Sequence, residues 1–150
     1  MKRALIVGAA VLAVLGMLAA GLYAWNTAPK VASIPAAEQD REGRPYVIKL
    51  HAQWCPKCLM TKGAWSELQA KYTGRVHFLV FDFTNQATTD ASGLAAHRVG
   101  LGDFFEHTGG TGSVIVLDGR TREVHAWLSG VHDVAEYSEA IDAALRKSGV

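Results

Sequence analysis

The chain has 150 residues and a nearly balanced charge, with 15 Lys and Arg against 14 Asp and Glu and a formal net charge of +1. It contains no basic stripe with interleaved aromatic residues, so the composition argues against a nucleic-acid partner. Its apolar N-terminal part leaves about 105 residues for a globular region, which is enough for one domain.

Residues 1–25 predict a membrane anchor. Lys2 and Arg3 precede an uncharged stretch from Ala4 to Trp25, and a helix of that length spans roughly the core of a bilayer. The two positive charges predict a cytoplasmic N-terminus, with the rest of the chain on the extracytoplasmic, or periplasmic, side of the cytoplasmic membrane. Cleavage of the segment as a signal peptide is the alternative, although its length favours a single retained span.

A tether and a domain are predicted to follow the anchor. Residues 26–43 are rich in Ala, Pro and polar residues and show no sustained period, so we interpret them as a tether to a domain over residues 44–150. In this domain, Tyr46–Ala52 predicts a buried strand. A helix is expected to begin around Cys55 and to end at Gly74, because apolar residues recur there at spacings of three and four.

The rest of the domain is predicted to contain three strands, of which the last two form a hairpin, and three helices. The expected strands are Val76–Phe83, Ser113–Leu117 and Arg122–Leu128, and the expected helices run from Thr88 or Asp90 to Arg98, across Asp103–His107, and from Asp133 onward. The Asp118-Gly119 turn supports the hairpin. Asp133 is the expected N-cap of the last helix, which should bury Val134, Tyr137, Ile141 and Leu145. The predicted order is therefore β-α-β-α-β-β-α.

The two cysteines of the chain, Cys55 and Cys58, lie at the predicted junction of the first strand and the first helix. This is the edge of the sheet at which open α/β folds place their sites. Free backbone N–H groups and the helix dipole at the N-terminus of a helix both favour a thiolate at Cys55. The helix dipole alone stabilises the thiolate of Cys55 too little, so we expect hydrogen bonds and Lys57 to stabilise it further. With Pro56 and Lys57 between them, Cys58 can resolve a mixed disulfide formed at Cys55.

The segment Lys49–Cys58, with the sequence KLHAQWCPKC, resembles the active-site strand and turn of the thioredoxin superfamily. The resemblance extends from about Arg44 to Leu145, and it implies a thioredoxin-like α/β fold with a central mixed sheet flanked by helices. It also implies that Cys55 is the exposed nucleophile, Cys58 the buried resolving thiol and Trp54 an aromatic wall beside them. Together with the anchor, the arrangement is similar to the TlpA and ResA kind of anchored thioredoxins, without the N-terminal hairpin usual there.

Several positions depart from the family pattern. Lys49 stands where thioredoxins carry a buried acid that helps to deprotonate the resolving cysteine. A lysine there could be a neutral base, a charged group that stabilises a thiolate, or a strand lysine that reaches the solvent. Gly112 takes the place of a cis-proline that faces the active site in the family. This replacement is expected to alter substrate binding and to ease the entry of a metal ion. Gly63 replaces a kinking proline, and the long segment Asn85–Gly110 predicts a rim over the cysteines or a packed surface excursion.

These observations predict a thiol-disulfide oxidoreductase that acts on protein thiols and disulfides through Cys55 and Cys58. It needs no bound cofactor, and a membrane redox partner is expected to exchange electrons with it. A structural disulfide is one alternative, although the short loop suits exchange chemistry better. A copper-delivery protein that holds Cu(I) with Cys55, Cys58 and His51 is a second alternative, and a non-catalytic assembly module is a third. A structural zinc site would need four ligands, and no second cysteine pair exists.

Overall fold

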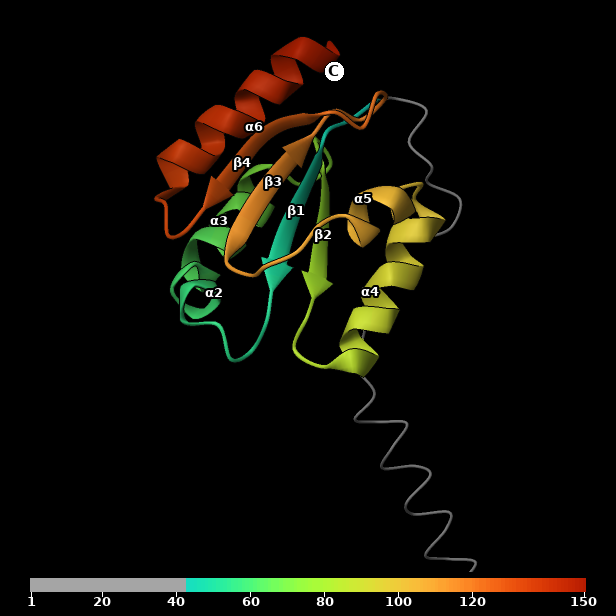
Figure 1. Cartoon of the computed structure of the whole chain (residues 1–150). Coiled ribbons are helices and arrows are strands. Elements are labelled where there is room, and N and C mark those ends of the chain that lie inside the picture. The colour runs from blue at the N-terminus through green and yellow to red at the C-terminus, as the bar shows by residue number, and fades with distance from the viewer. Residues whose placement is uncertain (1–42) are drawn as a thin grey trace, which may run out of the picture. The chain divides into compact units, whose positions relative to one another are not determined.

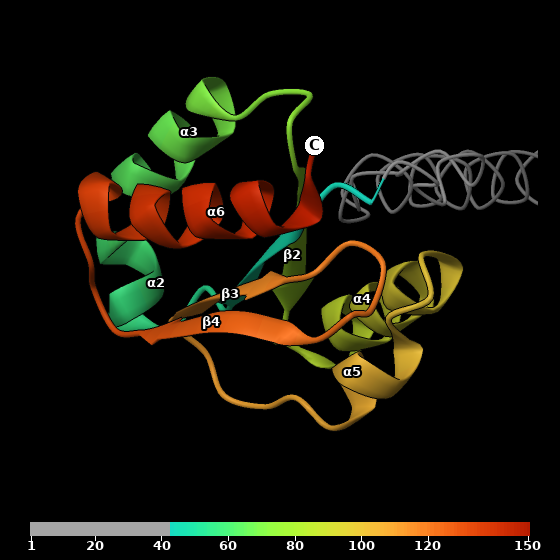
Figure 2. The same cartoon turned by 90° about the horizontal axis from the view of Figure 1, so that it is seen from above.

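A computed structural model of the chain describes residues 43–150. The predicted anchor and almost all of the predicted tether lie outside these residues, so the structure leaves both as predictions. No helix between residues 43 and 150 has the length and apolar character needed to cross a membrane. The described residues form a mixed four-stranded sheet with helices against both of its faces (Figures 1 and 2).

The sheet has the strand order β2-β1-β3-β4. These strands are β1 (Tyr46–His51), β2 (His77–Asp82), β3 (Ser113–Leu117) and β4 (Val124–Ser129). β1 pairs in parallel with β2 and antiparallel with β3, so it is central and fully hydrogen-bonded. Every β1 residue except the last is buried, which fits the continuous apolar pattern that predicted this strand. The carboxyl end of β1 leads directly to the two cysteines.

Within residues 43–150, five helices surround the sheet. They are α2 (Pro56–Met60), α3 (Lys62–Lys71), α4 (Gln86–Arg98), α5 (Gly102–Glu106) and α6 (Val134–Ser148). Figure 2 shows α3 and α6 over one face, and α4 and α5 over the other. The predicted order is confirmed, except that the first predicted helix is divided into α2 and α3 and the short helix α5 follows α4. The predicted cap of α6 is also confirmed, because the Asp133 side chain accepts a hydrogen bond from the backbone N–H of Glu136.

Three predicted elements differ from the structure by more than one residue at a boundary. The helix expected from Cys55 to Gly74 is broken at Thr61, whose hydroxyl donates to the carbonyl oxygens of Lys57 and Cys58 and so competes with the backbone ladder. α4 begins before Thr88 because Asn85 and Thr88 form a capping box. β4 begins later than Arg122, which has a positive φ of 64° and belongs to the turn.

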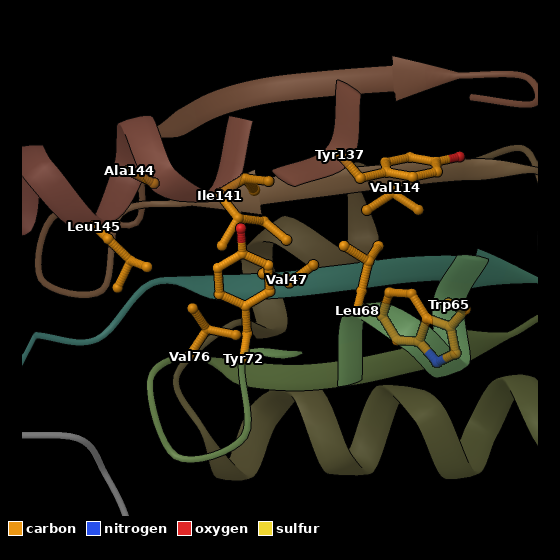
Figure 3. Packing of buried hydrophobic residues seen from close by; sticks show 11 residues of the cluster. Val47, Trp65, Leu68, Tyr72, Val76, Val114, Tyr137, Ile141, Ala144 and Leu145 are labelled. Carbon is orange, nitrogen blue, oxygen red and sulfur yellow. The ribbon is translucent and has the colours of Figure 1, made fainter. Parts of the chain in front are cut away.

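Each face of the sheet carries its own hydrophobic core. The core on the α3 and α6 side includes Val47 of β1, Leu68 of α3 and Ile141 of α6, which are fully buried (Figure 3). The core on the other side consists of Tyr46, Ile48, Leu50, Leu79, Phe81, Ala96, Val99, Leu101, Ile115 and Leu117. The alternation of β1 side chains between these two cores fixes which residues face the helix that carries the cysteines.

The segment Asn85–Gly110 packs against the second core. Leu101 is 1% exposed within it, and Phe104 and Phe105 pack against it from α5. The ring of Phe105 lies edge-on to Phe81, with a centroid distance of 5.0 Å. The structure therefore supports the interpretation of this segment as a packed excursion that covers one face of the sheet.

Candidate active site

Cys55 is the N-cap of the short helix α2. Its backbone is extended, with φ −88° and ψ 112°, and its sulfur accepts a hydrogen bond from the backbone N–H of Cys58 over 3.3 Å. Pro56 occupies the first helical position, where the missing N–H costs nothing and the fixed φ suits the helix. The sulfur of Cys55 thus takes the capping role that serine or aspartate oxygens usually have. The predicted position of Cys55 at a helix N-terminus is confirmed.

The loop before Cys55 is tied to the loop after β2. The backbone N–H of Gln53 donates to the Thr84 hydroxyl over 2.9 Å, and the indole N–H of Trp54 donates to the Thr84 carbonyl over 3.2 Å. Thr84 is itself held by Asp82, whose carboxylate accepts from the Thr84 backbone N–H over 2.8 Å. Trp54 is 65% exposed, so its ring stands at the surface next to the cysteine pair with its polar edge anchored.

The two thiols differ less in depth than the resemblance implied. Cys58 is 1% exposed, and its thiol donates to the carbonyl oxygen of Leu50 over 3.5 Å. Cys55, expected to be exposed, is only 5% exposed. The cover comes in part from Gly112, because a Cβ on Gly112 would lie 3.4 Å from the Cys55 sulfur. The sulfur of Cys55 is therefore largely covered in this structure.

The local environment makes the two thiols unequal acids. Burial opposes a thiolate at Cys55, but hydrogen bonding with the Cys58 side chain, with Thr111 and with the backbone N–H groups of Cys58 and Lys57 outweighs it and lowers the pKa of Cys55. Burial and the neighbouring Cys55 sulfur raise the pKa of Cys58. Lys57 contributes to the lowered pKa of Cys55 through its backbone N–H, and not through the charge of its side chain. The surroundings therefore favour a thiolate at Cys55 over one at Cys58.

Gly112 lies against the cysteines, as its alignment with the family's proline position implied. Its φ is +80°, its backbone N–H donates to the Leu50 carbonyl over 2.9 Å, and its own carbonyl accepts from the Gly130 N–H over 2.9 Å. No cis peptide bond occurs in residues 43–150. Proline would lose the hydrogen bond to Leu50 and cannot adopt this φ, so glycine is required by this backbone.

Lys49 is buried beneath the cysteines. It is 6% exposed, its Nζ donates to the Cys58 carbonyl over 3.4 Å, and the Nζ lies 5.7 Å from the centroid of the Trp65 ring. The interpretation as a lysine that reaches the solvent is therefore wrong. Burial lowers the pKa of Lys49, whereas the negative charges of thiolates at Cys58 and Cys55 would raise it.

His51 does not join the cysteines in a metal site. Across residues 43–150, no group of three or more His, Cys, Asp or Glu side chains is arranged to hold a metal ion. The Cu(I) ligand set of Cys55, Cys58 and His51 is thus not assembled in this structure. The Nδ1 atom of His51 is buried and has no hydrogen-bond partner among the described residues.

Sequence reasoning missed two threonines. Thr84 holds the loop that carries Trp54, and Thr111 contributes a hydrogen bond that lowers the pKa of Cys55. The pattern Asp82-x-Thr84 after a buried strand is typical of a side-chain turn, and it was the available signal for Thr84. Thr111 carried no such signal, because its role depends on the approach of the loop before β3 to α2.

Comparisons with known proteins agree with this fold. Residues 36–94 match the family model described as Thioredoxin. The crystal structure of a thiol:disulfide interchange protein, thioredoxin family protein from Chlorobium tepidum TLS has a TM-score of 0.50 at 16% identity, over 69% of this chain and 81% of that chain. A malarial protein structure has a TM-score of 0.47 at 20% identity, over 68% of this chain and 98% of that chain, a likeness too weak to support an inference.

No curated protein matches the chain. The strand order, the helices on both faces and the likeness to the Chlorobium tepidum structure agree on the architecture of residues 43–150. The domain has the thioredoxin-like fold, and the family match over residues 36–94 supports the thioredoxin superfamily for this chain.

Proposed function

We propose that the protein is a thiol-disulfide oxidoreductase that acts on the cysteines of client proteins through Cys55 and Cys58. The observation that carries the proposal is the capping of α2 by the Cys55 sulfur, at 3.3 Å from the backbone N–H of Cys58. This geometry stabilises a thiolate at Cys55 and places the second sulfur close behind it. The family match supports a thioredoxin-like redox function in general.

The proposed reaction has two steps. The Cys55 thiolate attacks one sulfur of a client disulfide, a new S–S bond forms, and the other client sulfur leaves with the electron pair as a thiolate. Cys58 then loses its proton and attacks the Cys55 sulfur, which forms the Cys55–Cys58 disulfide and releases the second client thiolate. The client is reduced by two electrons and the cysteine pair is oxidised. The same steps in reverse oxidise a client dithiol.

Trapping of the mixed disulfide tests these roles. In a Cys58→Ser variant, the attack by Cys55 should leave a stable protein–client disulfide, because nothing resolves it. In a Cys55→Ser variant, no such adduct should form, since Cys58 is 1% exposed and its pKa is raised by burial. Non-reducing electrophoresis and mass spectrometry of both variants with a disulfide-bonded model protein measure the adduct. Equal adduct in both variants would contradict the assignment of Cys55 as the nucleophile.

We also propose that the domain works outside the cytoplasmic membrane, held there by the N-terminal anchor. The support is the uncharged stretch from Ala4 to Trp25 after two positive residues. Electrons would then come from, or go to, a redox partner in the membrane. Protease treatment of spheroplasts tests the topology, because the proposal predicts that added protease digests the domain, whereas a domain protected until the membrane is lysed would contradict it.

A further inference from the structure

A pocket of about 380 Å³ opens beside Cys58 on the side of the sheet that α3 covers. Its lining consists of Lys49, His51, Gln53, Cys58, Leu59, Lys62 and Val80. Cys55 does not line this pocket, and neither do Gly112 and Thr111, which lie beside the Cys55 sulfur. The volume of the pocket lies within the range of pockets that bind small molecules.

The lining of the pocket carries basic groups without a matching acid. Lys49, His51 and Lys62 face it, and no carboxylate among residues 43–150 belongs to the lining. Lys49 is 6% exposed and has one hydrogen bond, of 3.4 Å, to the Cys58 carbonyl. An ammonium group has three donors, so most of its hydrogen-bonding capacity is unused. The buried Nδ1 of His51 also lacks a partner in this part of the chain.

Thiolates at Cys58 and Cys55 would raise the pKa of Lys49, but the other charged groups around Lys49 among the described residues do not supply the missing anion. Asp82 is paired with His51 in the sheet register, and its charge raises the pKa of His51, but burial is the larger effect and lowers it. The Asp82 carboxylate accepts hydrogen bonds from Thr84 and lies outside the pocket lining. Lys62 adds a second positive charge that further lowers the pKa of Lys49. A buried ammonium without a counter-ion is unfavourable, and an anion in the pocket would relieve that cost.

We infer that this pocket binds a small organic carboxylate. The carboxylate group lies between the Nζ of Lys49 and the imidazole of His51, and Lys62 stands at the exposed rim. The short apolar body of the ligand packs against Leu59 and Val80, which are 60% and 45% exposed and would gain cover. These apolar walls favour an organic acid over inorganic phosphate.

The binding itself is independent of the proposed function. An effect of binding on the redox chemistry does rest on the proposed function. A carboxylate beside Cys58 would oppose the thiolate that forms there when the mixed disulfide is resolved. Occupancy of the pocket would then slow resolution and shift the redox equilibrium of the cysteine pair. By linkage, the redox state of the cysteines would change the affinity of the pocket by the same factor.

Binding of 3-methylbutanoate to the full-length protein tests the inference. Nuclear magnetic resonance follows the His51 ring and the Lys49 side chain during titration at low ionic strength, with the neutral amide of the same acid and inorganic phosphate as comparison ligands. We expect saturable binding of the acid with a Kd on the order of 1 mM, a much weaker effect of the amide, and a raised pKa of His51 in the complex. Affinity should fall as the pH rises through that pKa, since the imidazolium form binds the anion.

Variants then assign the site. Lys49→Met should weaken binding by about ten-fold or more, Lys62→Met should weaken it less because that lysine is exposed, and Lys147→Met on α6 should leave it unchanged. Lys49→Arg keeps the charge and should retain most of the affinity. Retained binding in this variant would show that the loss in Lys49→Met comes from the missing charge and not from poor folding. Four results would each overturn the inference. They are equal binding of the acid and the amide, no saturation by about 50 mM acid, stronger binding of phosphate than of the acid, and unchanged binding of the acid in Lys49→Met. Cycling of Cys55 and Cys58 is measured separately, so either claim can fail alone.

Discussion

Replacement of Lys49 by methionine should slow the resolution of a mixed disulfide by Cys58. The change keeps the length and the apolar stem of the side chain but removes the amine that lies 3.4 Å from the Cys58 carbonyl. At an effective dielectric constant of about 20, two unit charges about 5 Å apart interact by about 3 kcal/mol. Burial lowers the pKa of Lys49, which weakens this interaction, so we expect a rate about ten-fold slower, equivalent to about 1.4 kcal/mol.

The reaction with a chromogenic aromatic disulfide isolates this step. Attack by Cys55 releases a first aromatic thiolate at a rate proportional to reagent concentration, and attack by Cys58 releases a second at a rate independent of it. Lys49→Met should slow the second release near neutral pH and should approach the wild-type rate at high pH, where hydroxide deprotonates Cys58 without help. Lys147→Met on α6, outside the lining of the pocket, is the control and should leave the second rate unchanged.

Two results would refute this reasoning. Equal second-phase rates in wild type and Lys49→Met near neutral pH would mean that the amine does not assist Cys58. A constant deficit at every pH would mean that the substitution disturbs the packing around the pair and not its ionisation. A melting curve of the variant separates these cases, because an ionisation effect leaves the folded structure intact.

Three further predictions follow from other residues. Gly112→Ala should slow the attack by Cys55 and cost about 1–2 kcal/mol of unfolding free energy. The φ of +80° disfavours alanine, and the new Cβ would lie 2.8 Å from the Lys57 Cβ. Gly109→Ala is the control, because a Cβ on Gly109 would have no atom within 4 Å. Ile141→Ala should cost about 2–5 kcal/mol in chemical denaturation, since Ile141 is fully buried. Asp118→Asn should destabilise the protein at neutral pH and less so in acid. Hydrogen bonds from Thr121 lower the pKa of Asp118, so its contribution is complete above the unfolded carboxyl pKa and is lost as the pH falls through the folded one.

Contradictory outcomes for these three are equally specific. An unchanged rate of Cys55 alkylation in Gly112→Ala would mean that the loop before β3 yields without cost. A loss below about 1 kcal/mol in Ile141→Ala would mean that the core collapses around the cavity. An Asp118→Asn deficit that grows in acid would reverse the sign of the linkage.

β1 and the last helix could be predicted from local pattern because each one buries a regular set of apolar residues. Val47 and Ile48 alternate between two cores, and Tyr137 and Ile141 recur at helical spacing on α6. The break at Thr61 could not be predicted, since a threonine hydroxyl competes with the helix ladder in some contexts and points to solvent in others. The anchor and tether remain predictions from composition and length.

The residues of the candidate site could be predicted from the sequence, but the burial of Lys49 and Cys55 could not. The spacing of Cys55 and Cys58 after a buried strand placed both at the start of a helix, and the structure confirms this. The depth of Lys49 depends on how closely α2 and Trp65 approach β1, which no local pattern specifies. The cover over Cys55 likewise depends on the loop that contains Gly112, more than fifty residues later in the chain.

The redox equilibrium of the full-length protein with glutathione tests the central claim most directly. Thiol trapping and mass spectrometry give the fraction of the protein with a Cys55–Cys58 disulfide at each ratio of reduced to oxidised glutathione. We predict a reversible two-electron transition with a potential between about −270 and −120 mV, the range of thioredoxin-like proteins. A cysteine pair that stays fully reduced or fully oxidised across these buffers would contradict a function in thiol-disulfide exchange.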